Sequence, residues 1–384
     1  MLDQRGLHVR TTLVPASVDT QELRALRAEV REFLRESIDN GDFVPKADAW
    51  QSSIDTEFSR RLGERGWLGM TLPVEYGGHG RSALERFVVT EELLAHGAPV
   101  AAHWIADRQM GPSILSHGTE EQKHKYLPGI ARGERFFGIG MSEPDSGSDL
   151  ASVRTRAVQD GTRWRITGTK LWTTSAHVAT NMILLARTDD GERHQGLSQF
   201  LIDLPNDGVS VNPIITVDGE HHFNEVVFDD AVFEADALLG TRGAGWQQVT
   251  GELANERSGP ERFLSPFPLL AAWSSTIDTD DAPATLELGR VVSRLLVLRQ
   301  MSLGVARQLA TGKQPAVEAA LVKDLGTTFE GDLVDTVRRM AMTEPGSAAT
   351  TFDDLLVDGI RHTPAFTLRG GTNEVLRSII AKGL

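Results

Sequence analysis

The spacing of hydrophobic residues changes twice along the chain and predicts three kinds of segment. Up to about Leu127, apolar residues recur at spacings of three and four, which is typical of amphipathic helices. From Phe136 to Leu239 the period changes to two, and Asp-Gly pairs separate the short apolar runs, which predicts strands joined by tight turns. After Gly245 the helical spacing returns. The order is therefore helical, then β, then helical.

This order predicts an α+β chain with an all-helical N-terminal domain, a middle antiparallel β-barrel or sandwich, and a helical C-terminal domain. The boundaries that we predict are 1–135, 136–240 and 241–384. Long amphipathic helices are expected at Leu286–Leu309 and Val317–Val337, and a short helix from Val375. Thr119, followed three residues later by Gln122, has the form of a capping box at a helix start.

Composition narrows the class of protein. The 384 residues carry a formal net charge of −14, which argues against a nucleic-acid surface and against a basic membrane-binding patch. The lack of cysteine excludes disulfides, thiolate catalysis and cysteine-ligated metals, and it fits a reducing compartment. No apolar run reaches the length of a transmembrane helix. We therefore expect a cytoplasmic protein with no nucleic-acid or membrane partner.

One stretch of the middle part combines turn chemistry with an aromatic side chain. The segment MSEPDSGSDL, residues 141–150, contains Gly147 between two serines, so its backbone can turn sharply and present N–H groups and hydroxyls. Further on, Trp172 offers a stacking face beside the hydroxyls of Thr173 and Thr174. Such a loop suits a planar, hydrogen-bonding cofactor. From turn chemistry alone, a plain loop followed by a hairpin is the commoner interpretation.

The strings in this stretch resemble a known signature. SEPDSGSDLA, followed by GTKLWTT at residues 168–174, resembles the signature of the acyl-CoA dehydrogenase family of FAD flavoproteins. LPVEYGG and GTEEQKHKYLPGIARGE resemble that family's N-terminal helical domain. The resemblance implies the α–β–α acyl-CoA dehydrogenase fold with a C-terminal four-helix bundle. It also implies FAD as cofactor, an acyl-CoA substrate, and a homodimer or homotetramer.

The resemblance also assigns residues to the site. It implies flavin contacts at Met141, Ser142, Trp172, Thr173, Thr174, Thr372 and Glu374. It implies contacts with the acyl-CoA substrate at Ser148, Arg257 and Gly371. A loop that opens a helix, as residues 370–373 would, favours anionic groups such as phosphates. The alternative for Thr372 is a simple helix N-cap.

The oxidation of a saturated acyl thioester needs a base for the α-proton, and a carboxylate serves when a water-poor site raises its pKa. In many family members the base precedes a Gly-Thr pair near the C-terminus, but Gly370 occupies that position here. A second arrangement in the family places a Glu before an Arg on the first helix after the β-domain, and Glu256 fits it. Glu252 and Glu261 are its competitors. The plain alternative is that Glu256 is a solvated helix carboxylate.

The resemblance implies an oxidoreductase that converts an acyl-CoA to the 2,3-enoyl-CoA and passes electrons to an electron-transfer flavoprotein. Two family segments that hold the adenine half of FAD, Arg-x-x-Phe-Gly and Gln-x-x-Gly-Gly, are missing. A non-catalytic subunit of a heteromeric dehydrogenase with a homologous chain is therefore an alternative, and a flavin monooxygenase on the same fold is another. We expect no metal site, because the histidines lack metal-ligand spacing and His221-His222 are expected in a turn.

Overall fold

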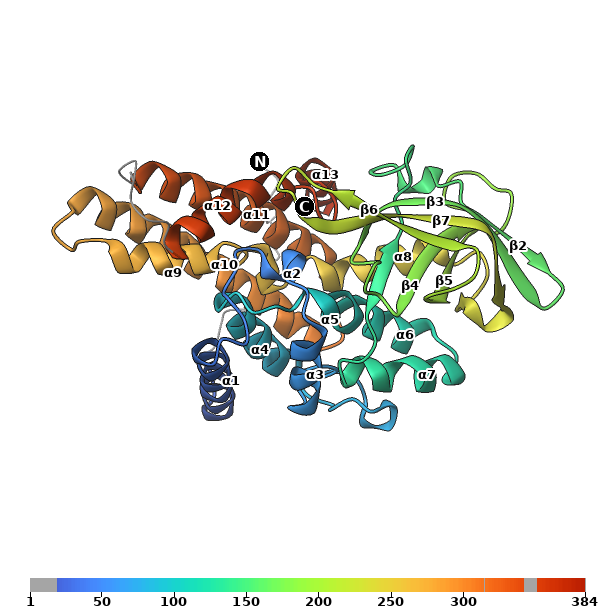
Figure 1. The fold of residues 1–384 in the computed structure, drawn as a ribbon, viewed down its shortest axis with the longest axis horizontal. Coiled ribbons are helices and arrows are strands. Elements are labelled where there is room, and N and C mark those ends of the chain that lie inside the picture. Colours follow the sequence, from blue (N-terminus) through green and yellow to red (C-terminus); the bar gives the residue numbers. More distant parts are fainter. Residues whose placement is uncertain (1–18, 314, 342–350, 384) are drawn as a thin grey trace, which may run out of the picture.

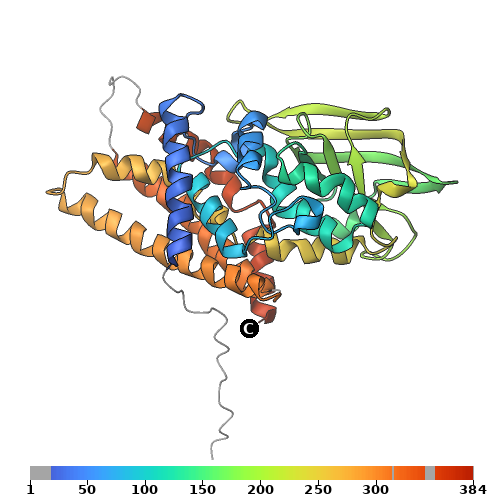
Figure 2. The ribbon, with the colours of Figure 1, turned by 90° about the horizontal axis from the view of Figure 1, so that it is seen from below.

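The structure is a computed structural model that describes residues 19–313, 315–341 and 351–383, except for the side chains of 252–256. Helices make up one end of the elongated molecule and a twisted β-sheet makes up the other (Figure 1). The view from below shows the N-terminal helices lying across the long C-terminal helices (Figure 2). None of the helices in the described parts combines the length and apolar character that crossing a bilayer requires.

The first part of the described chain is helical, as predicted. Its α-helices are α1 (Gln21–Asp39), α2 (Ala49–Ser52), α3 (Thr56–Glu64), α4 (Ala83–Ala95), α5 (Ala101–Ile105), α6 (Gly111–His117) and α7 (Glu120–Ala131). The predicted capping box opens α7: the Thr119 hydroxyl accepts from the Gln122 N–H at 3.2 Å, and the Gln122 amide oxygen accepts from the Thr119 N–H at 3.0 Å. The Gln122 amide nitrogen then donates to Leu238 O at 2.9 Å, which joins α7 to the sheet.

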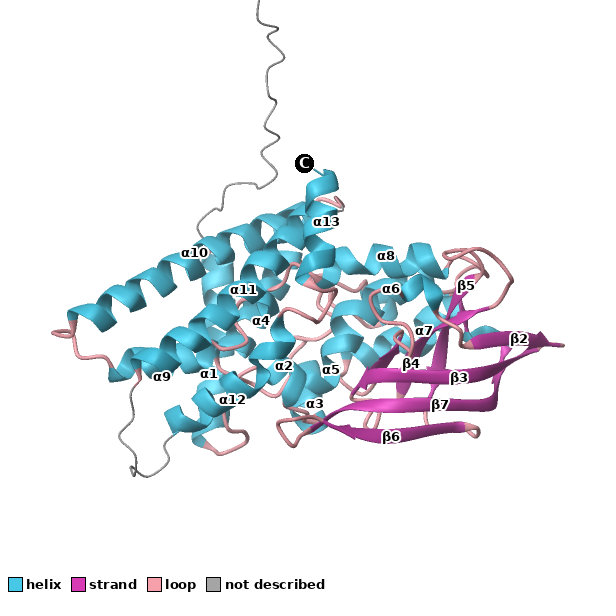
Figure 3. Ribbon diagram, turned by 90° about the horizontal axis from the view of Figure 1, so that it is seen from above, coloured by secondary structure: helices cyan, strands magenta, loops and turns pink. Residues whose placement is uncertain are grey.

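The middle part is one mixed sheet. Its strands are β1 (Phe137–Gly140), β2 (Arg156–Asp160), β3 (Arg163–Thr174), β4 (Asn181–Arg187), β5 (Leu197–Asp203), β6 (Val209–Ile215), β7 (His221–Glu234) and β8 (Leu238–Leu239). They run in the order β6-β7-β3-β2-β4-β5-β8, with β1 beside β4. Figure 3 shows β6, β7 and β3 lying side by side in this sheet. Most pairs are antiparallel, as expected, and the exceptions are the parallel pairs that β1 and β2 each make with β4. The expected His221-His222 turn was wrong, because both residues open β7.

The last part is helical again. Its helices are α8 (Gly245–Glu256), α9 (Phe267–Thr276), α10 (Ala282–Ala310), α11 (Ala316–Met340), α12 (Thr351–Phe366) and α13 (Asn373–Gly383). The predicted long helices correspond to α10 and α11, and the predicted short one to α13. The periodicity did not single out α12, which contains Pro364 within its last turn. The order of helical and β segments and the expected fold class are confirmed, whereas the exact domain boundaries stay a prediction.

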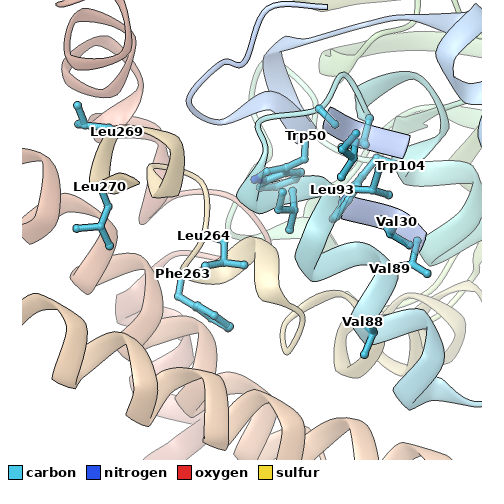
Figure 4. Close-up of a cluster of buried hydrophobic side chains, with 14 of the residues drawn as sticks. Val30, Trp50, Val88, Val89, Leu93, Trp104, Phe263, Leu264, Leu269 and Leu270 are labelled. Atoms are coloured by element: carbon cyan, nitrogen blue, oxygen red, sulfur yellow. The ribbon is translucent and has the colours of Figure 1, made fainter. Parts of the chain in front are cut away.

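The largest hydrophobic core joins the two helical parts of the chain. It includes Val30 from α1, Trp104 from α5, Phe263 from the segment after α8, and Phe329 from α11, all with at most 5% of their surface exposed. Figure 4 shows Val30, Val88 and Trp104 on one side of this cluster and Phe263, Leu264 and Leu270 on the other. Each fully buried aromatic or leucine side chain contributes roughly 1.5–3 kcal/mol. The first and last thirds of the chain therefore stabilise each other.

A second core lies inside the sheet, and a third lies where the sheet meets the N-terminal helices. The inner one packs Trp164 against Phe200 edge-to-face, with ring centroids 5.1 Å apart. The third joins Ile114 of α6 and Tyr126 of α7 to Phe137 of β1. Because the sheet packs on the N-terminal helices, and these share a core with the C-terminal helices, the three parts meet along a common boundary.

Glu330 places a carboxylic acid inside the helical core, where its charged form is costly. Glu330 of α11 is fully buried, and its Oε1 accepts the Ser265 N–H at 2.8 Å. Its Oε2 has no hydrogen-bond partner within the described ranges. Burial raises the pKa of the Glu330 carboxyl to about 8, against the lowering effect of the Ser265 hydrogen bond and of Arg369. The group is therefore largely protonated at neutral pH.

This burial predicts a pH dependence of stability. The folded chain holds a proton on Glu330 up to about pH 8, whereas in the unfolded chain the carboxyl has its ordinary pKa of 4.5. The contribution of Glu330 to the free energy of unfolding is fully present below pH 4.5 and is lost as pH rises through 8. It amounts to about 1.4 kcal/mol for each unit by which the folded and unfolded pKa values differ. We expect Glu330→Gln to keep the Ser265 contact. Its Tm should fall less between pH 5 and pH 8 than the Tm of the wild type does.

The control is Glu318→Gln, which removes a carboxylate from the first turn of the same helix, where it is only partly buried. Thermal unfolding of all three proteins at both pH values measures the effect. Parallel Tm curves for wild type and Glu330→Gln would show that Glu330 does not carry a proton in the folded chain.

Candidate active site

A cleft of about 670 Å³ opens where the three parts of the chain meet. Its described lining is mostly apolar or hydroxylic, and only one of these residues, Arg369, is charged. The N-terminal helices contribute Trp50, Gln51, Ala101, Trp104, Ile105 and Gln109. The sheet contributes Ile139, Met141, Ser142, Gly147, Ser148, Leu171, Trp172, Thr174 and Phe223. The C-terminal helices contribute Ala365 and residues 368–372. The lining thus comes from all three parts.

Trp172 stands out on the sheet side of the cleft. It sits at a register shift between Lys170 and Thr173 in β3, and its φ is +61°. A bulky side chain in this left-handed region costs of order 1–3 kcal/mol. Its indole nevertheless remains 52% exposed and meets Phe223 edge-to-face at 5.8 Å. The sheet therefore holds an aromatic face open to the cleft in a strained conformation, which is typical of a binding site.

A buried ion pair holds the loop beside Trp172. The Lys170 ammonium donates to Met141 O at 3.1 Å and to Glu143 Oε1 at 2.8 Å. The Glu143 carboxylate also accepts the backbone N–H groups of Arg154 and Thr155, at 2.6 and 2.9 Å. Burial lowers the pKa of Lys170 to about 8, although the Glu143 charge acts in the opposite direction. These bonds fix the loop that carries Met141 on the wall of the cleft.

A second buried lysine holds the opposite wall. The Lys323 amino group of α11 donates to Thr367 O at 3.1 Å, to Gly371 O at 2.8 Å and to Asn373 Oδ1 at 2.8 Å. Burial lowers the pKa of Lys323 to about 7, and the nearby Arg262 adds to the effect. Three acceptors around one nitrogen fix the path of the loop between α12 and α13.

Arg369 connects this loop to the N-terminal helices. Its Nη1 donates to both carboxylate oxygens of Asp48, at 3.0 and 2.9 Å, and its guanidinium lies 4.5 Å from the centre of the Trp50 ring. Asp48 itself adopts a left-handed conformation with φ +58° before α2. Arg369 thus joins the loop between α12 and α13 to the N-terminal segment around α2 at the edge of the cleft.

The structure brings most of the predicted site residues together. Seven of them line the cleft: Met141, Ser142, Ser148, Trp172, Thr174, Gly371 and Thr372. Thr372 also caps α13, because its hydroxyl accepts the Val375 N–H at 3.4 Å. Two predicted flavin contacts lie elsewhere: the Thr173 side chain is fully buried in the sheet, and Glu374 is exposed on α13. Their roles and those of the lining residues stay predictions.

The candidate base lies outside the described side chains, but its neighbour is well placed. Glu256 is the last residue of α8, and the side chains of 252–256, including Glu252, are not described. The following residue, Arg257, is 6% exposed and donates from Nε to Gly370 O at 3.0 Å. The end of α8 therefore lies against the loop of residues 368–372, here called the glycine loop, which lines the cleft. The competitor Glu261 is buried beside Arg108, with 3.3 Å between Oε1 and Nη2.

The hydrophobic periodicity did not single out the two lysines that hold the walls, although the sequence contains a signal for each. In β3, Trp164, Ile166 and Lys170 share the inward-facing parity of an alternating strand. In α11, Lys323 and Glu330 stand seven residues apart on the same buried stripe as Ala319. A charged residue at a core position is informative because burial of an unpaired charge is costly.

Comparisons with known proteins identify the family. Residues 20–134 match the acyl-CoA dehydrogenase N-terminal domain, and residues 138–231 match the acyl-CoA dehydrogenase middle domain. Acyl-CoA dehydrogenase FadE29 of Mycobacterium tuberculosis is 34% identical over 381 residues, which cover 94% of this chain and 96% of that protein.

Solved structures agree with this match. The Tcur3481-Tcur3483 steroid ACAD superimposes with a TM-score of 0.82 at 29% identity, covering 95% of this chain and 97% of that one. The ChsE4-ChsE5 complex from Mycobacterium tuberculosis gives a TM-score of 0.79 at 30% identity, covering 96% and 99%. The chain belongs to the acyl-CoA dehydrogenase family and is an oxidoreductase. Members of this family are FAD-dependent flavoproteins.

The residues of the cleft fit a flavin. The exposed Trp172 face suits a planar ring, and the hydroxyls of Ser142, Thr174 and Thr372 suit its polar edge. The positive φ angles of Gly370 and Gly371, +67° and +90°, let the backbone of the opposite wall turn tightly along the cleft. The donor set therefore combines an aromatic face with neutral hydrogen-bonding groups, as an isoalloxazine requires.

The anchoring of the glycine loop gives a testable consequence. We expect Lys323→Met to leave the carbonyl oxygens of Thr367 and Gly371 without their donor, and so to loosen the loop that lines the cleft. Each buried acceptor that loses its donor in this way destabilises a protein by about 1–3 kcal/mol. The variant should unfold at lower temperature and retain less FAD after gel filtration.

Lys313→Met is the matched control, because Lys313 is exposed in the turn after α10. Flavin absorbance per chain and Tm are compared for the three proteins. Equal flavin retention by Lys323→Met and wild type would contradict the anchoring role.

Proposed function

We propose that this chain oxidises an acyl-CoA thioester to the 2,3-enoyl-CoA, with Glu256 as the base and an external electron-transfer flavoprotein as electron acceptor. The observation that carries the proposal is the hydrogen bond from Arg257 Nε to Gly370 O at 3.0 Å. It ties the residue after Glu256 to the loop in which many family members carry their base. Within the described lining of the cleft there is no aspartate or glutamate, so a carboxylate entering from the end of α8 would complete the site.

The surroundings suit proton abstraction. In the reaction the α-proton passes to the base, and the β-hydrogen leaves with two electrons, which FAD accepts when bound. Trp50, Trp104 and Leu171 give the cleft apolar walls that exclude water. A carboxylate in such a site has a raised pKa, which makes it a better base near neutral pH. Arg257 follows the base, and its bond to Gly370 O suits a role in the local structure or in binding the CoA.

A heteromeric assembly is the second candidate. The ChsE4-ChsE5 and Tcur3481-Tcur3483 structures are named as complexes of two chains, and the latter as a steroid enzyme. The segments that hold the adenine half of FAD in many members are missing from this sequence. These features support a partner of homologous sequence that completes the site, and a bulky, ring-containing acyl group as one substrate class to test. The flavin side of the cleft would then belong to this chain.

The base assignment predicts a large loss of activity. Glu256→Gln keeps the size and hydrogen bonding of the side chain but removes the proton acceptor. We expect flavin content to survive and the reduction of flavin by acyl-CoA to slow by at least about 10²-fold. Anaerobic bleaching of the flavin, followed with straight-chain and steroid acyl-CoA substrates, measures it.

Glu252→Gln, one helical turn earlier, is the control and should reduce flavin at the wild-type rate. Near-normal reduction by Glu256→Gln would show that the base lies elsewhere. If neither wild type nor variants turn over until a homologous chain is added, the heteromeric alternative holds.

Assembly can be tested on an exposed apolar face. Leu286, Val292, Leu296 and Val297 of α10 are 38–59% exposed, which is unusual for a helix of a monomer. We expect these residues to be buried between subunits in a dimer or a dimer of dimers. The double variant Leu296→Glu/Val297→Glu should therefore lower the mass measured by light scattering towards 41.9 kDa.

Lys313→Glu, which changes an exposed residue beyond the end of α10, serves as the control for added negative charge. A wild-type protein that already runs at 41.9 kDa at micromolar concentration would contradict the prediction.

A further inference from the structure

Three side chains from separate parts of the fold converge just outside the cleft. Asp218 lies in the turn between β6 and β7, His222 is the second residue of β7, and His362 lies in α12. Their side chains are only 8%, 6% and 10% exposed. The β6–β7 hairpin therefore reaches from the sheet to the C-terminal helices, and these polar groups lie where the two meet.

The distances among these groups are those of a compact ligand set. Asp218 Oδ2 lies 3.8 Å from His222 Nε2 and 3.4 Å from His362 Nε2, and all three atoms lie within 4.8 Å of one another. Zinc ligands at about 2.0–2.2 Å in tetrahedral geometry lie roughly 3.3 Å apart. The three atoms, all within 4.8 Å of one another, would have to draw together to this separation to surround one cation.

The groups behind the three residues orient them toward their common centre. Asp218 Oδ1 accepts the Glu220 N–H at 3.0 Å and the Thr216 hydroxyl, which leaves Oδ2 to face the histidines. On the far side of the His362 ring, Nδ1 lies 3.6 Å from Asp48 Oδ2. A carboxylate behind a histidine is the usual outer partner of a metal-bound imidazole.

A simple ion pair explains this cluster less completely. A protonated His362 between Asp48 and Asp218 would satisfy both carboxylates. It would leave His222 Nε2 buried with no hydrogen-bond partner among the residues that the structure describes. His222 Nε2 lies 3.8 Å from Asp218 Oδ2, which is too far for a hydrogen bond, and an imidazole nitrogen placed in this way can serve as a metal ligand. A cation would engage both imidazoles and the carboxylate together.

We propose that His222 Nε2, His362 Nε2 and Asp218 Oδ2 bind a divalent transition-metal cation, for which Zn²⁺ is the best match. Two imidazoles and one carboxylate are a ligand set that Zn²⁺ accepts, with water in the fourth position. The cation would fasten the β6–β7 hairpin to α12. Through Asp48 and Arg369 it would also steady the loop that lines the cleft. The role is structural, and the proposal does not depend on the base or on the substrate.

The test uses the full-length protein, stripped with a chelator and titrated with ZnCl₂ by calorimetry. We expect one Zn²⁺ per chain. His222→Gln and His362→Gln should each abolish saturable binding, and Asp48→Asn should weaken it by about 10–100-fold through the loss of the outer carboxylate. Asn tolerates the left-handed conformation of position 48, so this last variant retains the local backbone.

The control is His221→Gln. His221 neighbours the site in sequence, but its ring stacks on His177 with centroids 3.9 Å apart, so its removal should leave binding unchanged. Circular dichroism verifies that each variant is folded, and Asp218→Asn replaces any that is not. No saturable Zn²⁺ binding by wild type, or equal binding by folded ligand variants, would overturn the proposal.

Discussion

The hydrophobic core shared by the first and last thirds of the chain is the constraint on which the rest of the structure depends. Trp104 and Val30 from the N-terminal helices pack in one cluster with Phe263 and Phe329 from the C-terminal part. Neither helical part can bury these side chains alone, so they must fold against each other. The sheet between them in sequence is then held at their boundary by the separate cluster around Phe137. The cleft is the space that this three-way packing leaves.

Buried charges, rather than apolar contacts, determine the shape of the cleft walls. Each buried amino group needs acceptors, and the acceptors of Lys170 and Lys323 are mostly carbonyl oxygens of the loops that line the cleft. The guanidinium of Arg369 acts in the same way on Asp48. Because a buried unpaired charge is far more costly than a paired one, the loops have little freedom to leave these positions. A site that binds a rigid ring system gains from such fixed walls.

A series of polar contacts links the proposed base, the glycine loop and the proposed cation site. Arg257 brings the end of α8 to Gly370, and Arg369, the residue before Gly370, binds Asp48 in the N-terminal helical part. Asp48 then faces both Arg369 and His362. A change at the β6–β7 hairpin can therefore reach the cleft through three consecutive polar contacts, although the hairpin tip itself lies outside it.

The sequence by itself determined the α–β–α order, the long helices α10 and α11, the capping box at Thr119, and the family. These features depend on neighbouring residues, whose periodicity and turn chemistry act over a few positions. The sequence did not reveal the parallel pairing of β1 with β4, the helix α12, or the strand position of His222, because pairing partners and Pro-containing helices are chosen by tertiary contacts. The resemblance to the family assigned Trp172, Thr173, Thr174 and Thr372 to one site; three of them line one cleft, whereas Thr173 is buried in the sheet. Only the tertiary structure decided which distant groups meet, such as Lys323 with Gly371, because such contacts arise from packing across separate segments and leave no trace in local spacing.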